Sequence, residues 1–200
     1  LARAVGEKNH PNGGIGSPRS KGGGVRVKSR GLSTIPDRAL EVVKQLIMSG
    51  IAPSTLIYES LLNIWLKSQR PDSPRVAESI FRSMVGRTPG PPTLRSFKLL
   101  LETYARSPLP NAAEKAEEVL ETMKAAKVEP DAAVYSLIAR AWSKSWRHSG
   151  AVLVVTDAQS GEVVRMDYLT RTTQAYRRCL EAGLKPDASM LRSLLSGYCR

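Results

Sequence analysis

The sequence predicts an all-α protein, an α-solenoid of stacked helix-turn-helix repeats, and three observations support this. The segment KVEPDAAVYSLIARAWSK at 127–144, a proline followed by an apolar helical face, recurs near residues 51, 91 and 184. The copies keep a large apolar residue five positions after the proline and a basic residue nine positions further on: Tyr58, Phe97, Tyr135 and Leu191, then Lys67, Arg106, Lys144 and Arg200. Between the copies, apolar residues at helical spacing predict a second helix in each unit. Because one hairpin cannot bury its apolar stripe, consecutive hairpins must stack.

Composition narrows the class of protein. The 200 residues are 42% apolar, enough for a sizeable core, and the net charge of +12 favours a polyanionic partner such as nucleic acid or an anionic surface. No apolar run is long enough to span a membrane, and no secretory signal is visible. Cys179 and Cys199 are expected to be reduced core residues, without disulfide or zinc spacing. The start at Leu1 and the stop at Arg200 within a repeat predict a piece of a longer chain.

Residues 1–35 are expected to form a disordered basic arm. They carry eight of the fifteen glycines and show no apolar periodicity. Seven basic residues against Glu7 alone give this segment a charge of +6, half the total. The arm either lies on RNA phosphates or is a solvated linker or targeting remnant. On the first interpretation its phosphate candidates are Arg19, Lys21, Arg26, Lys28 and Arg30.

Helical repeats are predicted over residues 36–200. A partial unit at 36–53 has Asp37 as its expected N-cap, and Gly50 ends its helix at the C′ position. Two full units are expected next, at 54–92 and 93–130. In each, a first helix is followed by a second with an apolar stripe.

The last units are less regular. Unit 131–186 is longer, with an expected insertion at 146–167, and unit 187–200 is partial. Within the insertion, AVLVVTDAQSGEVVRMD has two β-prone runs around a glycine-containing turn, which predicts a small β-hairpin projecting from the stack.

Four segments carry a family resemblance: EAGLKPD at 181–187, GIAPS at 50–54, LLSGYCR at 194–200 and AEEVLETM at 116–123. From about residue 37 to 200 the chain resembles pentatricopeptide repeat proteins of the P type. The resemblance implies a single-stranded RNA partner, no cofactor or small-molecule substrate, and a mitochondrial or chloroplast role in RNA processing, stability or translation. The Trp/Leu-Gly/Tyr pattern of tetratricopeptide repeats is not seen.

The resemblance also implies which side chains face RNA bases. Two positions per repeat face a base, which gives the pairs Glu59 with Thr93, Lys98 with Asp131 and Ser136 with Asp187; Arg192 has no partner before the chain ends. Only Ser136 with Asp187 resembles a base-specifying combination, of the kind associated with guanine. Glu59 would repel phosphate, and Lys98 would attract it without choosing a base.

Helix chemistry offers a second explanation for the same residues. Ser54, Thr93, Asp131 and Asp187 each precede a first helix, where such residues are preferred N-caps. Lys67, Arg106, Lys144 and Arg200 are expected at helix C-termini, where the helix dipole favours cations, yet one edge of the stack also suits a phosphate backbone. Both explanations remain open. The aromatic residues Tyr58, Trp65, Phe97, Tyr104, Tyr135 and Trp142 are expected in the core.

Three functions compete. The first is a non-catalytic RNA-binding solenoid. The second is a scaffold subunit of a mitochondrial ribosome or another RNA–protein assembly, contacting rRNA and proteins with little base specificity. The third is an enzyme whose catalytic domain lies beyond Arg200. The 200 residues contain no Cys/His cluster, Walker loop or nucleophile motif.

Overall fold

The computed structural model describes residues 34–87, 92–149, 153–156, 163–166 and 168–198. Its elements run in the order α1 (Ile35–Met48), α2 (Thr55–Ser68), α3 (Ser73–Arg87), α4 (Leu94–Arg106), α5 (Ala112–Ala125), α6 (Ala132–Ser149), β1 (Leu153–Thr156), β2 (Val163–Met166), α7 (Tyr168–Glu181) and α8 (Ala188–Tyr198). Residues 1–33 of the predicted arm, with its five phosphate candidates, lie outside these residues, as do Cys199 and Arg200. Thr34 and Ile35, also assigned to the arm, are the N-cap and first residue of α1. No described helix is long and apolar enough to cross a membrane.

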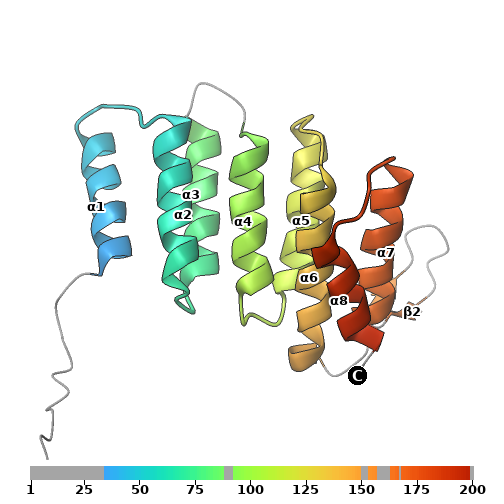
Figure 1. The fold of residues 1–200 in the computed structure, drawn as a ribbon. Coiled ribbons are helices and arrows are strands. Elements are labelled where there is room, and N and C mark those ends of the chain that lie inside the picture. The colour runs from blue at the N-terminus through green and yellow to red at the C-terminus, as the bar shows by residue number, and fades with distance from the viewer. Residues whose placement is uncertain (1–33, 88–91, 150–152, 157–162, 167, 199–200) are drawn as a thin grey trace, which may run out of the picture. The chain divides into compact units, whose positions relative to one another are not determined.

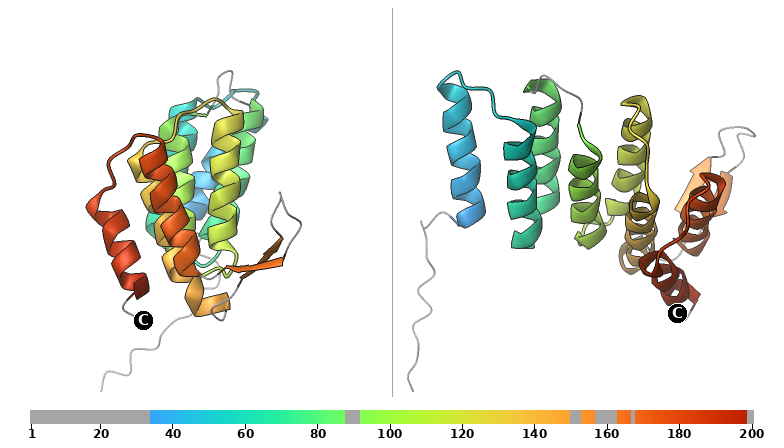
Figure 2. Two further views of the ribbon diagram at one scale, coloured as in Figure 1. Left: turned by 90° about the vertical axis from the view of Figure 1, so that its right-hand side faces the viewer. Right: turned by 45° about the horizontal axis from the view of Figure 1, so that its top comes forward.

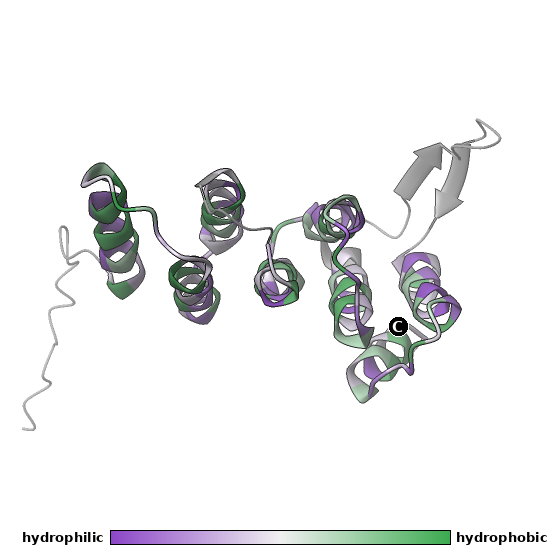
Figure 3. Cartoon of the chain, turned by 90° about the horizontal axis from the view of Figure 1, so that it is seen from above, coloured by the Kyte–Doolittle hydropathy of each residue, from purple (hydrophilic) through white to green (hydrophobic). Residues whose placement is uncertain are grey.

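The helices form two layers, as the repeat pattern predicts (Figures 1 and 2). The first-type helices α2, α4, α6 and α8 contact one another in sequence. The second-type helices α3, α5 and α7 each pack on the first-type helix before and the one after, and α1 packs on α2. Seen from above, α2, α4 and α6 follow one side of the row, and α1, α3 and α5 follow the other (Figure 3). The predicted helical solenoid is therefore confirmed.

The core lies between the two layers. All six aromatic residues expected there are buried: Tyr58, Trp65, Phe97, Tyr104, Tyr135 and Trp142. They belong to first-type helices, and the second-type helices add apolar side chains such as Phe81, whose ring lies 5.0 Å from that of Phe97. Cys179 is buried and free, as expected, and burial raises the pKa of its thiol.

The start of α1 differs from the prediction that Asp37 is its N-cap. The cap is Thr34, and the Asp37 carboxylate accepts hydrogen bonds from the Thr34 N–H at 3.2 Å and its hydroxyl at 2.5 Å. Pro36 lacks an N–H donor and fits the first turn of a helix, so α1 begins before it.

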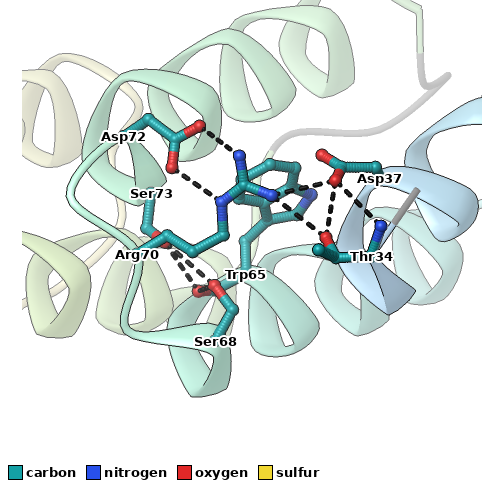
Figure 4. Close-up of polar contacts among 7 residues, drawn as sticks. All are labelled: Thr34, Asp37, Trp65, Ser68, Arg70, Asp72 and Ser73. Carbon is teal, nitrogen blue, oxygen red and sulfur yellow. Dashed lines mark hydrogen bonds and ion pairs between the residues drawn. The ribbon is translucent and has the colours of Figure 1, made fainter. Parts of the chain in front are cut away.

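A guanidinium ties the start of α1 to the turn between α2 and α3 (Figure 4). Arg70 donates to Asp37 at 2.9 Å and to both oxygens of Asp72 at 2.9 and 2.7 Å, and it lies over the Trp65 ring. The hydrogen bond from the Thr34 hydroxyl, together with the one from Arg70, lowers the pKa of the Asp37 carboxyl. Arg70 therefore links the N-terminus of α1 to the turn between α2 and α3.

Helices α1, α5 and α7 end in the same way. Gly50, Lys127 and Gly183 have positive φ angles of 78°, 55° and 70° at the C′ position. Each is followed by a residue whose N–H reaches back to the last turn; Val128, for example, donates to the Met123 carbonyl at 3.0 Å. This hydrogen-bond pattern is the Schellman motif. The expected helix end at Gly50 is confirmed, and the motif recurs at two of the later units.

The predicted hairpin is present between α6 and α7. β1 and β2 pair antiparallel, with Leu153 opposite Met166. The expected start of the insertion at Trp146 is too early, because α6 continues to Ser149. Its sequence contains no glycine or proline before Gly150, so no residue interrupts the helix earlier.

Candidate nucleic-acid interface

Three rows of polar residues run across the first-type helices, with successive rows four residues apart along each helix. Residues with this spacing lie on one helix face. The first row consists of Glu59, Lys98, Ser136 and Arg192, the middle row of Asn63, Glu102, Arg140 and Ser196, and the described part of the cation row of Lys67, Arg106 and Lys144. The predicted base-facing and phosphate-facing candidates therefore share a face. The sequence interpretation omitted the middle row, which the same spacing reveals.

The structure joins each predicted pair by direct contact; Glu59–Thr93, Lys98–Asp131 and Ser136–Asp187 are termed the cross-repeat pairs here. In each pair, the first-row residue of one repeat contacts the residue that precedes the next first-type helix. Their separation in sequence is 33 to 51 residues, so stacking of the repeats brings them together.

The first cross-repeat pair is closed. The hydroxyl groups of Thr93 and Ser96 donate to Glu59 Oε1 at 2.5 and 2.9 Å, and Arg95 Nε lies 3.6 Å from Oε2. The Glu59 residue is only 5% exposed. A base could reach this carboxylate only by displacing its protein partners.

The second cross-repeat pair is an ion pair. Lys98 Nζ donates to Asp131 Oδ2, while Asp131 Oδ1 accepts the N–H of Val134 at 3.1 Å. Both side chains remain about one-third exposed or more. The contact partly neutralises Lys98, which lowers the charge available to a phosphate.

The third cross-repeat pair is open. Asp187 Oδ1 accepts hydrogen bonds from the Ser136 hydroxyl at 2.7 Å and from the Met190 N–H at 2.8 Å. Among the described residues Oδ2 has no hydrogen-bond partner, and Asp187 is exposed. An exposed carboxylate oxygen can accept hydrogen bonds from a base edge.

The capping explanation also holds. Thr93, Asp131 and Asp187 each accept a backbone N–H in the first turn of the following helix. Ser54 stands at the N-cap of α2, but its side chain makes no capping hydrogen bond. Capping and cross-repeat contact therefore coexist in the same three residues, because their side chains lie between two successive first-type helices.

The cation row differs from its prediction at one point. Lys67 and Arg106 lie in the last turns of α2 and α4, but Lys144 is not at a helix C-terminus, because α6 continues to Ser149. Arg106 pairs with Glu102 one turn earlier. Arg106 and Lys144 nevertheless line one cavity of about 320 Å³ at the ends of α2 and α4.

Arg140 is the charged residue of the middle row on α6. It is half-buried, and this burial lowers the pKa of its guanidinium. Glu102, Arg106 and Asp187 are near enough to influence it electrostatically. Within the described part of the chain, no cluster of three or more His, Cys, Asp or Glu residues could hold a metal ion.

Comparison with protein-family models identifies a family for this chain. The family model described as the pentacotripeptide-repeat region of PRORP matches residues 26–145, more than half of the chain. No curated protein matches. The match covers α1 to α5 and most of α6, including the first two cross-repeat pairs.

Proposed function

Because the chain belongs to the pentatricopeptide-repeat family, we propose that it is a single-stranded RNA-binding helical-repeat protein of mitochondria or chloroplasts, acting in RNA processing, stability or translation. Proteins of this family are commonly organellar and generally bind RNA, and their repeat solenoids are typically non-catalytic. Under this proposal, the described repeats bind RNA and have no catalytic role.

The observation that best supports this proposal is that the cross-repeat pairs and the cation row lie on the same face of the first-type helices. Base-facing candidates lie at the start of the first-type helices, and Lys67, Arg106 and Lys144 lie two turns further along the same helices. This arrangement suits a strand whose bases meet one row while its phosphates meet the other. The net charge of +12 adds a general attraction for a polyanion.

A scaffold function in an RNA–protein assembly is favoured by a different observation. The first cross-repeat pair is closed, and the second is an ion pair whose charges offset each other. Two of the three described pairs therefore offer little to a base. In this case the repeats would hold RNA, including rRNA, by its phosphates and would contact other proteins.

Charge reversal in the cation row tests RNA binding directly. In the double variant Lys67→Glu and Arg106→Glu, we expect affinity for a labelled single-stranded RNA to fall at least tenfold at about 0.1 M salt, because two favourable phosphate contacts become repulsive. The control is Arg75→Glu with Arg177→Glu, which changes net charge equally at exposed positions on the second-type helices α3 and α7.

Fluorescence anisotropy over a range of salt concentrations measures both effects. The slope of log K against log salt should become shallower by about 0.7 for each phosphate that the cation-row variant no longer neutralises. Equally weakened binding by the two double variants would show that only net charge matters. Unchanged binding in both would contradict RNA binding by this part of the chain.

A further inference from the structure

An open apolar groove lies between α1 and α2, where the described part of the solenoid starts with a second-type helix. The later second-type helices α3, α5 and α7 each pack between two first-type helices, whereas α1 packs on one first-type helix, α2, among the described elements. The groove has a volume of about 360 Å³, and its lining is apolar apart from Ser60. Open apolar surfaces of this kind mark sites of protein contact.

Equivalent positions in the later repeats identify the neighbour that this groove lacks. Ile57 of α2 is exposed, whereas its equivalents Ser96, Val134 and Met190 are all buried. The Ser96 hydroxyl donates to Glu59, which belongs to the preceding first-type helix. The position of Ile57 therefore suits contact with a first-type helix on the other side of α2 from α4.

The exposed side of α1 indicates the same neighbour. Val42 is 64% exposed, although the equivalent residues of the later second-type helices are buried: Ile80, Val119 and Ala175. Ile35 is also exposed, and its equivalent in α3 is the buried Ser73. The Ser73 hydroxyl donates to the Trp65 carbonyl of the preceding first-type helix at 3.1 Å. Both helices of the groove therefore present apolar side chains where a first-type helix packs in the later repeats.

The opposite end of the row of helices presents a helix of this kind (Figure 1). The first-type helices α2, α4 and α6 each lie between two second-type helices, whereas α8 has one, α7, among the described elements. Leu191, Leu195 and Tyr198 form an apolar stripe on α8, and all three are exposed. The equivalent residues of the earlier first-type helices are buried; in α2 they are Tyr58, Leu62 and Trp65.

The two ends are complementary in the kind of helix that each accepts. The groove between α1 and α2 accepts a first-type helix, and α8 is a first-type helix whose apolar stripe accepts a second-type helix. Residues 1–33 show no apolar periodicity, so the sequence does not predict that they supply the helix for the groove. Repeats of this class gain stability by stacking on their neighbours, and the surfaces that stack inside this chain are the ones exposed at its two ends.

We propose that copies of this chain associate head to tail, with α8 of one copy seated in the groove between α1 and α2 of the next. In this arrangement α8 and the α1 helix of the next copy form one complete repeat. The contact joins two different surfaces, so it is heterologous and each copy keeps one surface for a further copy. The association does not depend on the RNA binding proposed above.

Two single substitutions test this inference, because a head-to-tail contact uses a different surface on each copy. Val42→Glu places a charge in the groove, and Leu195→Glu places one on the apolar stripe of α8. Both side chains are mostly exposed, at 64%, so neither change should disturb the fold. The matched control is Val85→Glu, at an exposed apolar position of α3 that belongs to neither surface. Thermal melting checks that every variant is folded.

Sedimentation velocity from micromolar to several hundred micromolar protein measures the association. The mean mass of the wild-type chain and of Val85→Glu should rise with concentration from the monomer value of 21.8 kDa to at least twice that value. Val42→Glu and Leu195→Glu should each stay monomeric. An equimolar mixture of these two variants should form dimers and nothing larger, because α8 is intact in the first variant and the groove is intact in the second.

Four results would overturn the inference. A wild-type chain that stays monomeric would show that neither surface takes a second copy. Association that only one of the two substitutions abolishes would show that this surface pairs with its own equivalent. Association that persists in both variants would place the contact elsewhere. A mixture of the two folded variants that stays monomeric would show that the groove and α8 are not partners.

Discussion

The first and third cross-repeat pairs occupy equivalent places in the solenoid but differ in what they leave accessible. Glu59 is buried beneath Arg95, Ser96 and Thr93, whereas Asp187 is exposed and keeps one oxygen free among the described residues. The difference originates after the capping residue. Arg95 and Ser96 stand two and three positions beyond Thr93, but Ser189 and Met190 stand there beyond Asp187.

This comparison shows that position in a repeat does not by itself make a residue available to a base. The side chains of Thr93, Asp131 and Asp187 each lie between two first-type helices, and the residues of the next helix turn decide whether the contact is closed. At α4 those residues add a hydroxyl and a guanidinium, while at α8 Met190 contributes only its backbone N–H. We expect closed pairs to contribute to stability, whereas an open pair leaves polar atoms accessible to a ligand.

The sharpest test of this comparison is Glu59→Ala. It leaves the buried Ser96 hydroxyl and the Thr93 hydroxyl without their acceptor, so the free energy of unfolding should fall by about 2–3 kcal/mol. Urea denaturation followed by circular dichroism measures the change. The control Lys98→Ala removes a more exposed ion pair and should cost about 1 kcal/mol or less. A decrease from Glu59→Ala no larger than that from its control would contradict the closed description of the first pair.

A smaller effect is expected at the open pair. Asp187→Ala removes the N-cap of α8 and should lower the free energy of unfolding by about 1 kcal/mol. Asp187→Asn keeps an acceptor for the Met190 N–H and should cost less than about 0.5 kcal/mol. The same denaturation experiment compares the two variants. If both cost as much as Glu59→Ala, the third pair is as strongly structural as the first.

The smallest effect is predicted for Lys127, which lies four residues before Asp131 of the second cross-repeat pair. Its φ of 55° is left-handed, and the equivalent turn residues Gly50 and Gly183 are glycines. Lys127→Gly should raise the free energy of unfolding by about 0.5–1 kcal/mol, because glycine adopts this conformation without strain. Thermal melting with Lys124→Gly as the control separates the turn from the helix, where glycine should destabilise. A decrease for both variants would contradict backbone strain at Lys127.

Much of the fold follows from the sequence because its determinants are periodic. Apolar residues at helical spacing predict α2, α4 and α6, and Gly50 predicts the end of α1. The predicted base-facing pairs do meet, since residues at equivalent positions of successive repeats become neighbours when the repeats stack.

Other features depend on contacts that periodicity does not encode. The contact that encloses the Glu59 carboxylate comes from Ser96, which is 37 residues away in the sequence. The donors of Arg140 that lack a partner among the described residues are seen only in the packed structure. Aspartate favours the N-cap, which predicts Asp37 there, but Thr34 competes for the position and Pro36 fits the first turn. The repeat pattern predicts Lys144 at a helix end because its equivalents occur there, yet nothing interrupts α6 before Gly150.

The recurring turn at Gly50, Lys127 and Gly183 bears on how such a chain can change its length. At each place the helix end is completed by backbone hydrogen bonds within a few residues, so the departing chain has the same local geometry. Genetic crossover between two of these turns would duplicate or delete whole hairpins and leave every helix intact. The turns are therefore the natural boundaries for lengthening this array, both by gene duplication and in engineered chimeras.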